Sequence, residues 1–182
     1  MVRLFVALNI PSDIKEYLLN TCRHLAVHPD KFRWETPDKI HLTLKFIGEV
    51  EDNLVDSIKT ELDFIKNYHS FNFSVSKFDF FFRNGEPRIL WAGLKTDDPI
   101  DNLIEEINRR LEKFSIPAER RKFKPHLTML RIKIHPGEKF IQAFKNYELG
   151  KLNFTAKNIS LIRSRLSTAS AKYSEIKKYK LK

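Results

Sequence analysis

Several features that point to other protein classes are missing from this 182-residue sequence. A single cysteine, Cys22, excludes an internal disulfide framework, so we expect a reducing cytoplasm and a buried, inert thiol. No apolar stretch approaches the length of a membrane span, and we expect no membrane association. The apolar residues 1–8 are too few for a signal peptide and predict a first β-strand.

Linkers and, in one region, acidic residues are also scarce. No Gly/Ser-rich linker, short-period repeat or low-complexity segment interrupts the chain, which predicts one two-lobed domain over residues 1–182. Residues 119–182 contain 17 Lys and Arg against 4 Asp and Glu, whereas residues 1–118 contain 16 against 19. This uneven positive charge favours a polyanionic partner such as RNA, although a lysine-rich C-terminus can also serve solubility alone.

A tripeptide that occurs twice is the strongest functional signal in the chain. Residues 41–43 and 126–128 are both His-Leu-Thr, and each copy lies in an apolar run with strand character, over residues 40–47 and 127–132. Because side chains alternate along a strand, the His and the Thr of each copy share one face while the Leu points to the core. Two such strands side by side would place two imidazoles and two hydroxyls in one cleft.

Such a group of side chains suits the hydrolysis of a phosphodiester. One imidazole can take a proton from water while the other gives a proton to the leaving oxygen, and a pKa of about 6.5 makes both states accessible near neutral pH. Thr43 and Thr128 can donate hydrogen bonds to the non-bridging oxygens. A lone strand histidine is more often structural, but the repeated tripeptide favours a functional pair, His41 and His126. The sequence shows no compact carboxylate/histidine cluster of the two-metal kind, so we expect no metal and no cofactor.

These residues also carry a resemblance to a known family. Residues 34–48 (WETPDKIHLTLKFIG) and 123–131 (FKPHLTMLR) resemble the paired motifs of the 2H phosphoesterases. The most similar branch is the RNA 2′,3′-cyclic phosphodiesterases, long labelled 2′-5′ RNA ligases. Further matches are Arg88 three places before Trp91, and Ser164, Leu166 and Tyr173 near the C-terminus. The sequence departs from the family at Ser170, where glycine is usual, and at Phe82, where proline is usual, which affects loop shape and substrate preference.

The resemblance implies a reaction and a role for each site residue. It implies metal-independent hydrolysis of RNA 2′,3′-cyclic phosphate ends to 2′-phosphomonoesters, with 2′-5′ ligation as the reverse reaction. His41 is then the proton donor to the 3′ oxygen and His126 the proton acceptor from water, although nothing in the spacing distinguishes them. Arg131 is a candidate phosphate contact, but strict alternation from His126 puts it on the opposite face unless the strand ends or bulges first. Lys45, on the His41 face by strict alternation, is a second candidate.

The resemblance also implies a fold, and the order of expected elements is compatible with it. The implied fold class is α+β, with two pseudo-twofold-related lobes, each a small antiparallel sheet with helices on its outer face, and a central cleft between the sheets. Helical periodicity predicts helices over residues 13–25, 51–66, 99–114 and 136–146, with Ser12 and Asp98 as the N-caps of the first and third. Strand patterns predict strands over residues 71–82, 88–94, 151–161 and 173–181, with a loop over 165–172.

The main alternative is a non-catalytic, basic RNA-binding module. Alternating aromatics over residues 71–82 would suit a base-stacking platform on a sheet, but aromatic side chains dominate protein interiors, so we favour a core role for them. The alternative also gives no role to the paired tripeptides. We expect a monomer whose partner is an RNA or oligonucleotide with a 2′,3′-cyclic phosphate end, with residues 119–182 along one rim of the cleft.

Overall fold

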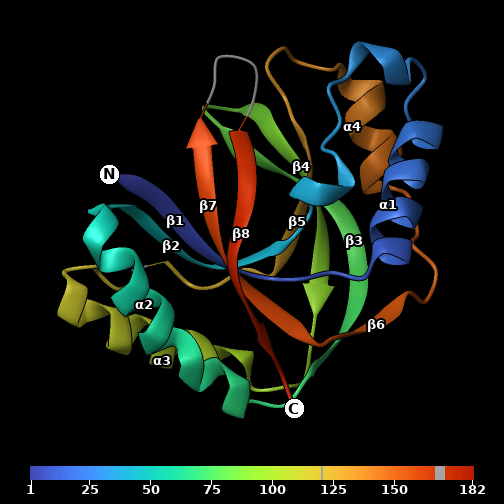
Figure 1. Ribbon diagram of the computed structural model, residues 1–182. Coiled ribbons are helices and arrows are strands. Elements are labelled where there is room, and N and C mark those ends of the chain that lie inside the picture. The colour runs from blue at the N-terminus through green and yellow to red at the C-terminus, as the bar shows by residue number, and fades with distance from the viewer. Residues whose placement is uncertain (120, 167–170) are drawn as a thin grey trace.

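Each motif strand lies at the edge of a four-stranded antiparallel sheet (Figure 1). The computed structural model describes residues 1–119, 121–166 and 171–182, so Ser170 lies outside the described residues. Sheet A has the strand order β2-β1-β7-β8 and sheet B the order β5-β4-β3-β6. The strands are β1 (Val2–Leu8), β2 (Leu42–Val50), β3 (Phe71–Arg83), β4 (Glu86–Lys95), β5 (His126–Arg131), β6 (Asn153–Ala156), β7 (Asn158–Leu166) and β8 (Ala171–Lys180). The predicted α+β fold of two antiparallel sheets is therefore confirmed.

The two sheets do not correspond to the two halves of the chain. The hairpin β3–β4 belongs to the sheet of the second motif, and the C-terminal hairpin β7–β8 joins the sheet of the first motif. The single strand predicted over residues 151–161 is wrong, because the chain leaves sheet B after β6 and enters sheet A at β7. Periodicity could not show this change of partner, since both short strands place apolar residues toward a core.

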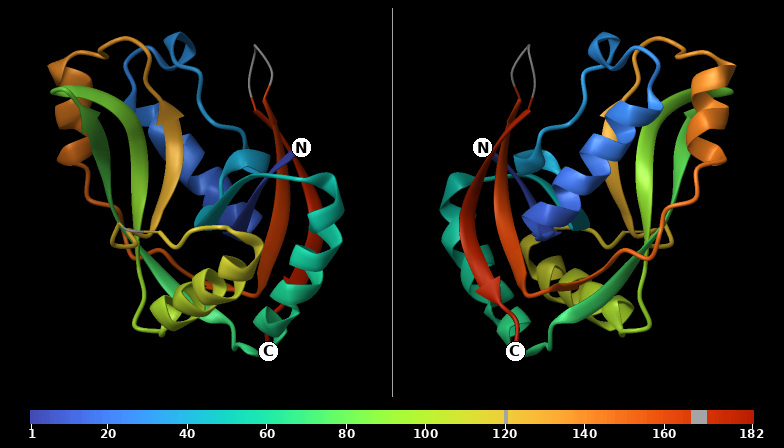
Figure 2. Two further views of the ribbon diagram at one scale, coloured as in Figure 1. Left: turned by 90° about the vertical axis from the view of Figure 1, so that its left-hand side faces the viewer. Right: turned by 90° about the vertical axis from the view of Figure 1, so that its right-hand side faces the viewer.

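The helices are exchanged between the sheets as well. The α-helices are α1 (Ser12–Leu25), α2 (Val55–Glu61), α3 (Ile100–Leu111) and α4 (Glu138–Lys145). Helix α1 follows a strand of sheet A but packs against α4 and β5, while α3 follows a strand of sheet B but packs against α2 and β2 (Figures 1 and 2). The helix predicted over residues 51–66 is only partly α-helical, because 3₁₀ turns flank α2 on both sides. Each sheet is thus covered by one helix from each half of the chain.

The aromatic residues of β3 form core, as the sequence favoured. Phe71, Phe73, Phe78 and Phe80 are buried, and the register of β3 with β4 shifts between Val75 and Phe78. Phe82, by contrast, is 47% exposed. Cys22 is a free, fully buried thiol whose pKa is raised by burial. No helix in the described ranges is long and apolar enough to cross a membrane.

Candidate active site

The two motif histidines occupy equivalent places on edge strands that contact each other. His41 directly precedes β2 and His126 begins β5, and these two strands are in contact. His41, Thr43, His126 and Thr128 are half-buried, whereas the leucine between each pair is fully buried. The predicted alternation of His and Thr against Leu is therefore present in both motifs. The positive charge of protonated His126 acts on the pKa of His41, which shows that the imidazoles share one electrostatic environment.

Each imidazole rests on aromatic rings from its own sheet. The His41 ring stacks on Phe5 with centroids 4.9 Å apart, and Tyr173 meets it edge-on at 5.5 Å. The His126 ring meets Phe81 edge-on at 4.9 Å, and the Trp91 ring lies 6.2 Å away. These rings fix the orientation of both imidazoles and remove water from one side of each.

A backbone carbonyl two residues earlier in the chain acts on each histidine ring. Nδ1 of His126 lies 2.7 Å from the carbonyl oxygen of Lys124, and because a carbonyl can only accept, Nδ1 carries the proton. The neutral ring therefore has its lone pair on Nε2. For His41 the corresponding Lys39 carbonyl favours the protonated ring, but Nδ1 makes no hydrogen bond of good geometry in the described part of the chain. The two imidazoles are thus held differently.

Both histidines are neutral at pH 7 in the unliganded protein. Burial, reinforced by the charge of Lys15, lowers the pKa of His41 from 6.5 to about 4. Burial is also the main cause that lowers the pKa of His126, while the Lys124 carbonyl opposes this effect. The charge of Arg131 lowers both values, so the site is electropositive. A bound anion would offset these effects and favour protonation.

A β-bulge follows the threonine of each motif. In β5 the register with β4 shifts between Thr128 and Leu130, so Met129 is the extra residue, and both Met129 and Leu130 are buried. In β2 the register with β1 shifts between Lys45 and Thr43, which makes Leu44 the extra residue. A bulge reverses the alternation beyond it. Residues after the bulge therefore face the opposite side from the one that strict alternation assigns.

The bulge in β5 brings Arg131 to the histidine face. Its charge acts on both imidazoles and on the Tyr173 hydroxyl, whose pKa burial raises. Nε of Arg131 is 3.2 Å from Glu35 Oε1, and Glu35 is only 15% exposed. The backbone N–H of Glu35 donates to the carbonyl of the bulged Met129 at 2.9 Å, which ties the ion pair to the bulge. The condition stated for Arg131, that its strand must end or bulge, is therefore met.

The bulge in β2 removes Lys45 from the histidine face and replaces it with Phe46. Lys45 is 2% exposed and its Nζ donates to the carbonyl of Pro117 at 2.5 Å, so its prediction as a second phosphate contact is wrong. Phe46 is 60% exposed and pairs in register with Phe5, whose ring stacks on His41. Phe46 is the counterpart of Arg131, since both lie five residues after their histidines.

Sequence reasoning missed several residues that surround the histidines. The rings of Phe5 and Phe81 come from strands other than the motif strands, and Lys15 and Glu35 come from α1 and a loop. The family resemblance gave a signal for Tyr173 and Trp91, and Glu35 lies within the first matching segment, residues 34–48. Within the described ranges, no group of three or more His, Cys, Asp or Glu side chains is arranged to hold a metal ion.

Two antiparallel sheets, each with a His-Leu-Thr motif at an edge strand, thus frame the candidate active site. The model of the family described as LigT like Phosphoesterase matches residues 8–91 and 94–173, so the chain belongs to that family. The predicted membership of the 2H phosphoesterases, which are hydrolases of phosphodiesters, is confirmed.

Relatives and solved structures agree with this assignment. The chain is 31% identical over 144 residues to the RNA 2′,3′-cyclic phosphodiesterase of Thermotoga maritima, covering 78% of this chain and 76% of that protein. It is 27% identical to the protein of the same name from Methanocaldococcus jannaschii, over 98% of this chain and all of the other. A crystal structure of a protein from Thermus thermophilus superposes with a TM-score of 0.81 at 22% identity, covering 98% and 97% of the two chains. That of Escherichia coli LigT complexed with 3′-AMP has a TM-score of 0.74 at 21% identity, covering 99% and 98%.

Proposed function

We propose that this protein hydrolyses RNA 2′,3′-cyclic phosphate ends to 2′-phosphomonoesters without a metal ion. The observation that carries the proposal is the pair of differently held imidazoles, His41 and His126, on adjoining edge strands that share an electropositive site. Relatives that carry the name RNA 2′,3′-cyclic phosphodiesterase support the same substrate. Hydrolysis dominates over the reverse 2′-5′ ligation because water is in great excess.

The general base is His126. Its Nδ1 proton is held by the Lys124 carbonyl, so Nε2 is the free acceptor for a proton from the attacking water. The water oxygen forms a bond to phosphorus while the bond from phosphorus to the 3′ oxygen breaks. The 3′ oxygen takes its proton from His41, which leaves a 3′-hydroxyl and a 2′-phosphate. Entry of the anionic phosphate raises the pKa of His41 from its low value in the free protein, so the ring takes up a proton. This is the proton that His41 then donates.

Charge that develops on the phosphate is stabilised by Thr43, Thr128 and Arg131. Both threonines share the face of their histidine, and neither hydroxyl is engaged by another group in the described residues. Arg131 is oriented by Glu35 through Nε and also hydrogen-bonds to the Tyr173 side chain, so the remaining N–H groups of its guanidinium can donate to phosphate oxygens. The alternative of a non-catalytic module with a stacking platform is weakened, because all the alternating aromatics of β3 except Phe82 are buried.

A single assay tests the proposed reaction. An oligonucleotide with a 2′,3′-cyclic phosphate end is incubated with the protein in the presence of EDTA, and the product is identified by ³¹P NMR. We expect a 2′-phosphomonoester at an undiminished rate. A 3′-phosphate product, or loss of activity that added metal restores, would overturn the proposal.

A further inference from the structure

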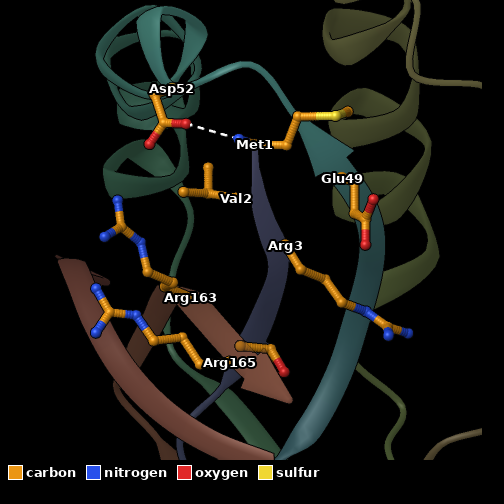
Figure 3. A pocket seen from close by; sticks show the side chains of 8 residues that line it. Met1, Val2, Arg3, Glu49, Asp52, Arg163 and Arg165 are labelled. Carbon is orange, nitrogen blue, oxygen red and sulfur yellow. Dashed lines mark ion pairs between the residues drawn. The ribbon is translucent and has the colours of Figure 1, made fainter. Parts of the chain in front are cut away.

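A cavity of about 530 Å³ lies at one end of sheet A, and neither histidine lines it (Figure 3). Its lining includes Arg3, Arg163, Ser164 and Arg165. Ser164 pairs in register with Tyr173, which contacts the His41 ring, so Ser164 belongs to the histidine face of sheet A. Arg163 and Arg165 flank Ser164 along β7 and therefore lie on the opposite face, which we call the outer face. Clefts that bind small ligands are commonly of this size.

Like charges gather on this outer face, where one nearby carboxylate, Asp52, has its pKa lowered by the N-terminal amino group and in smaller part by the charge of Arg163. Arg163 and Arg165 are two residues apart on β7, and Figure 3 shows their side chains extending in the same direction, while Arg3 extends away from them. Lys172 is the direct cross-strand partner of Arg165, and Ser174 is that of Arg163. Like charges in directly opposite positions destabilise a sheet. Three cations and one hydroxyl thus share this face by register, and the two arginines among them line the cavity.

The Arg163 guanidinium is also incompletely satisfied. Its Nε is buried and has no hydrogen-bond partner in the described part of the chain. A buried donor without a partner costs about 1–3 kcal/mol unless a ligand or water satisfies it. The nearby carboxylate that lines the cavity, Asp52, is engaged by the amino group of Met1 at 2.9 Å. Glu49 also lines the cavity, but it pairs in register with Arg3 on the histidine face.

We propose that Arg163, Arg165, Lys172 and Ser174 form a second phosphate-binding site, separate from the histidine site. Two parallel guanidinium groups fit the oxygens of one phosphate, and the lysine and the hydroxyl supply further donors. The phosphate belongs either to the backbone of a bound RNA or to a free phosphate compound. The RNA source rests on the proposed function, because the strand would then cross the end of sheet A beside Tyr173.

A titration with inorganic phosphate tests the site without any turnover. The ¹⁵N–¹H signal of Arg163 Nε is followed while phosphate is added to the full-length protein in the millimolar range. We expect a saturable shift, and at least about tenfold weaker binding in Arg165→Ala, where an exposed side chain is removed and Arg163 still reports. Arg109→Ala, which removes an exposed arginine from α3, is the matched control and should leave the affinity unchanged. No saturable shift, or equal affinity in Arg165→Ala, would overturn the site.

Binding of 2′-phosphorylated oligonucleotides identifies the source of the phosphate. If RNA supplies it, Arg163→Ala/Arg165→Ala weakens binding of a long oligonucleotide but not of a mononucleotide, and the slope of log affinity against log salt falls by about 1.4. If this slope is the same in the variant and the unaltered protein, and inorganic phosphate still gives the saturable shift, the site binds a free phosphate compound. Failure of the proposed function would show in the EDTA assay and would leave the phosphate titration intact, so the two results are distinguishable.

Discussion

At the scale of single residues, the two histidines share a motif but differ in what holds them. His126 donates Nδ1–H to a carbonyl, whereas His41 is stacked on Phe5 with an Nδ1 that has no partner in the described residues. Burial and nearby cations keep both rings neutral in the empty site. A neutral base is ready for catalysis, but the acid must first be charged. In the proposed mechanism, the phosphate of the substrate charges this acid by raising the pKa of His41.

This account predicts a pH-dependent affinity for phosphorylated products. Because the pKa of His41 is about 4 in the free protein and a bound anion raises it, binding takes up a proton. The affinity for a nucleoside 2′-phosphate should therefore rise as pH falls from 7 toward 5. NMR titration of the imidazole signals, assigned with His41→Ala, measures both pKa values. A free-protein pKa of 6.5 or above for His41 would contradict this explanation.

The threonines provide a second test at this scale. Thr43→Ala or Thr128→Ala removes one of several hydrogen bonds to an anionic oxygen, so kcat should fall by about 10²-fold while activity stays measurable. Thr→Ser at the same positions keeps the hydroxyl and should retain most of the rate. Equal losses in the alanine and serine variants would assign the threonines a packing role instead.

At the scale of elements, side-chain alternation predicted the faces of the motif residues correctly. It failed beyond the β-bulge that follows each motif. The His-Leu-Thr faces could be predicted because no irregularity interrupts those three residues. Beyond them, Leu44 and Met129 are extra residues, so Lys45 turns into the core while Phe46 and Arg131 turn to the histidine face. No residue type in either strand marks a bulge, since apolar residues occupy both bulged positions. The bulge in β5 follows from contacts with residues 34–35, which are remote in sequence.

Phe46 gives a prediction for β2. Its ring is 60% exposed beside the histidine site, so Phe46→Ala should change the free energy of unfolding by less than about 1 kcal/mol. If the ring stacks on a base of the substrate, KM for RNA should rise about 5- to 100-fold. Tyr17→Ala, which also removes an exposed aromatic ring but from α1, is the control and should leave KM unchanged. A normal KM in Phe46→Ala would exclude a stacking role.

At the scale of the whole molecule, the two sheets are interleaved by exchange of both hairpins and helices. Strand β1 lies between β2, from the N-terminal half, and β7, from the C-terminal half, while β4 lies between β3 and β5. Helices α1 and α3 each cover the sheet that their own flanking strands do not form. The sequence predicted two sheets through resemblance, but local patterns could not predict which strands pair, because partner choice depends on contacts between distant segments.

The exchange predicts that neither half of the chain folds alone. A fragment of residues 1–96 lacks β5–β8, and a fragment of residues 97–182 lacks the central strands β1 and β4. Both fragments should show no cooperative thermal transition by circular dichroism, whereas the mixture of the two should regain one. A cooperative transition in either fragment by itself would contradict the interleaved arrangement.

The division of labour between the two histidines is tested most directly with an activated substrate. His41→Ala and His126→Ala should each lose activity toward a 2′,3′-cyclic phosphate, because each proton transfer contributes roughly 10²–10⁴-fold. A phosphodiester with a good leaving group needs little protonation of that group. Such a substrate should therefore restore turnover in His41→Ala and not in His126→Ala. Two results would contradict catalysis by a paired acid and base. The first is that either variant keeps its activity toward the cyclic phosphate, and the second is that the activated substrate restores turnover in neither variant.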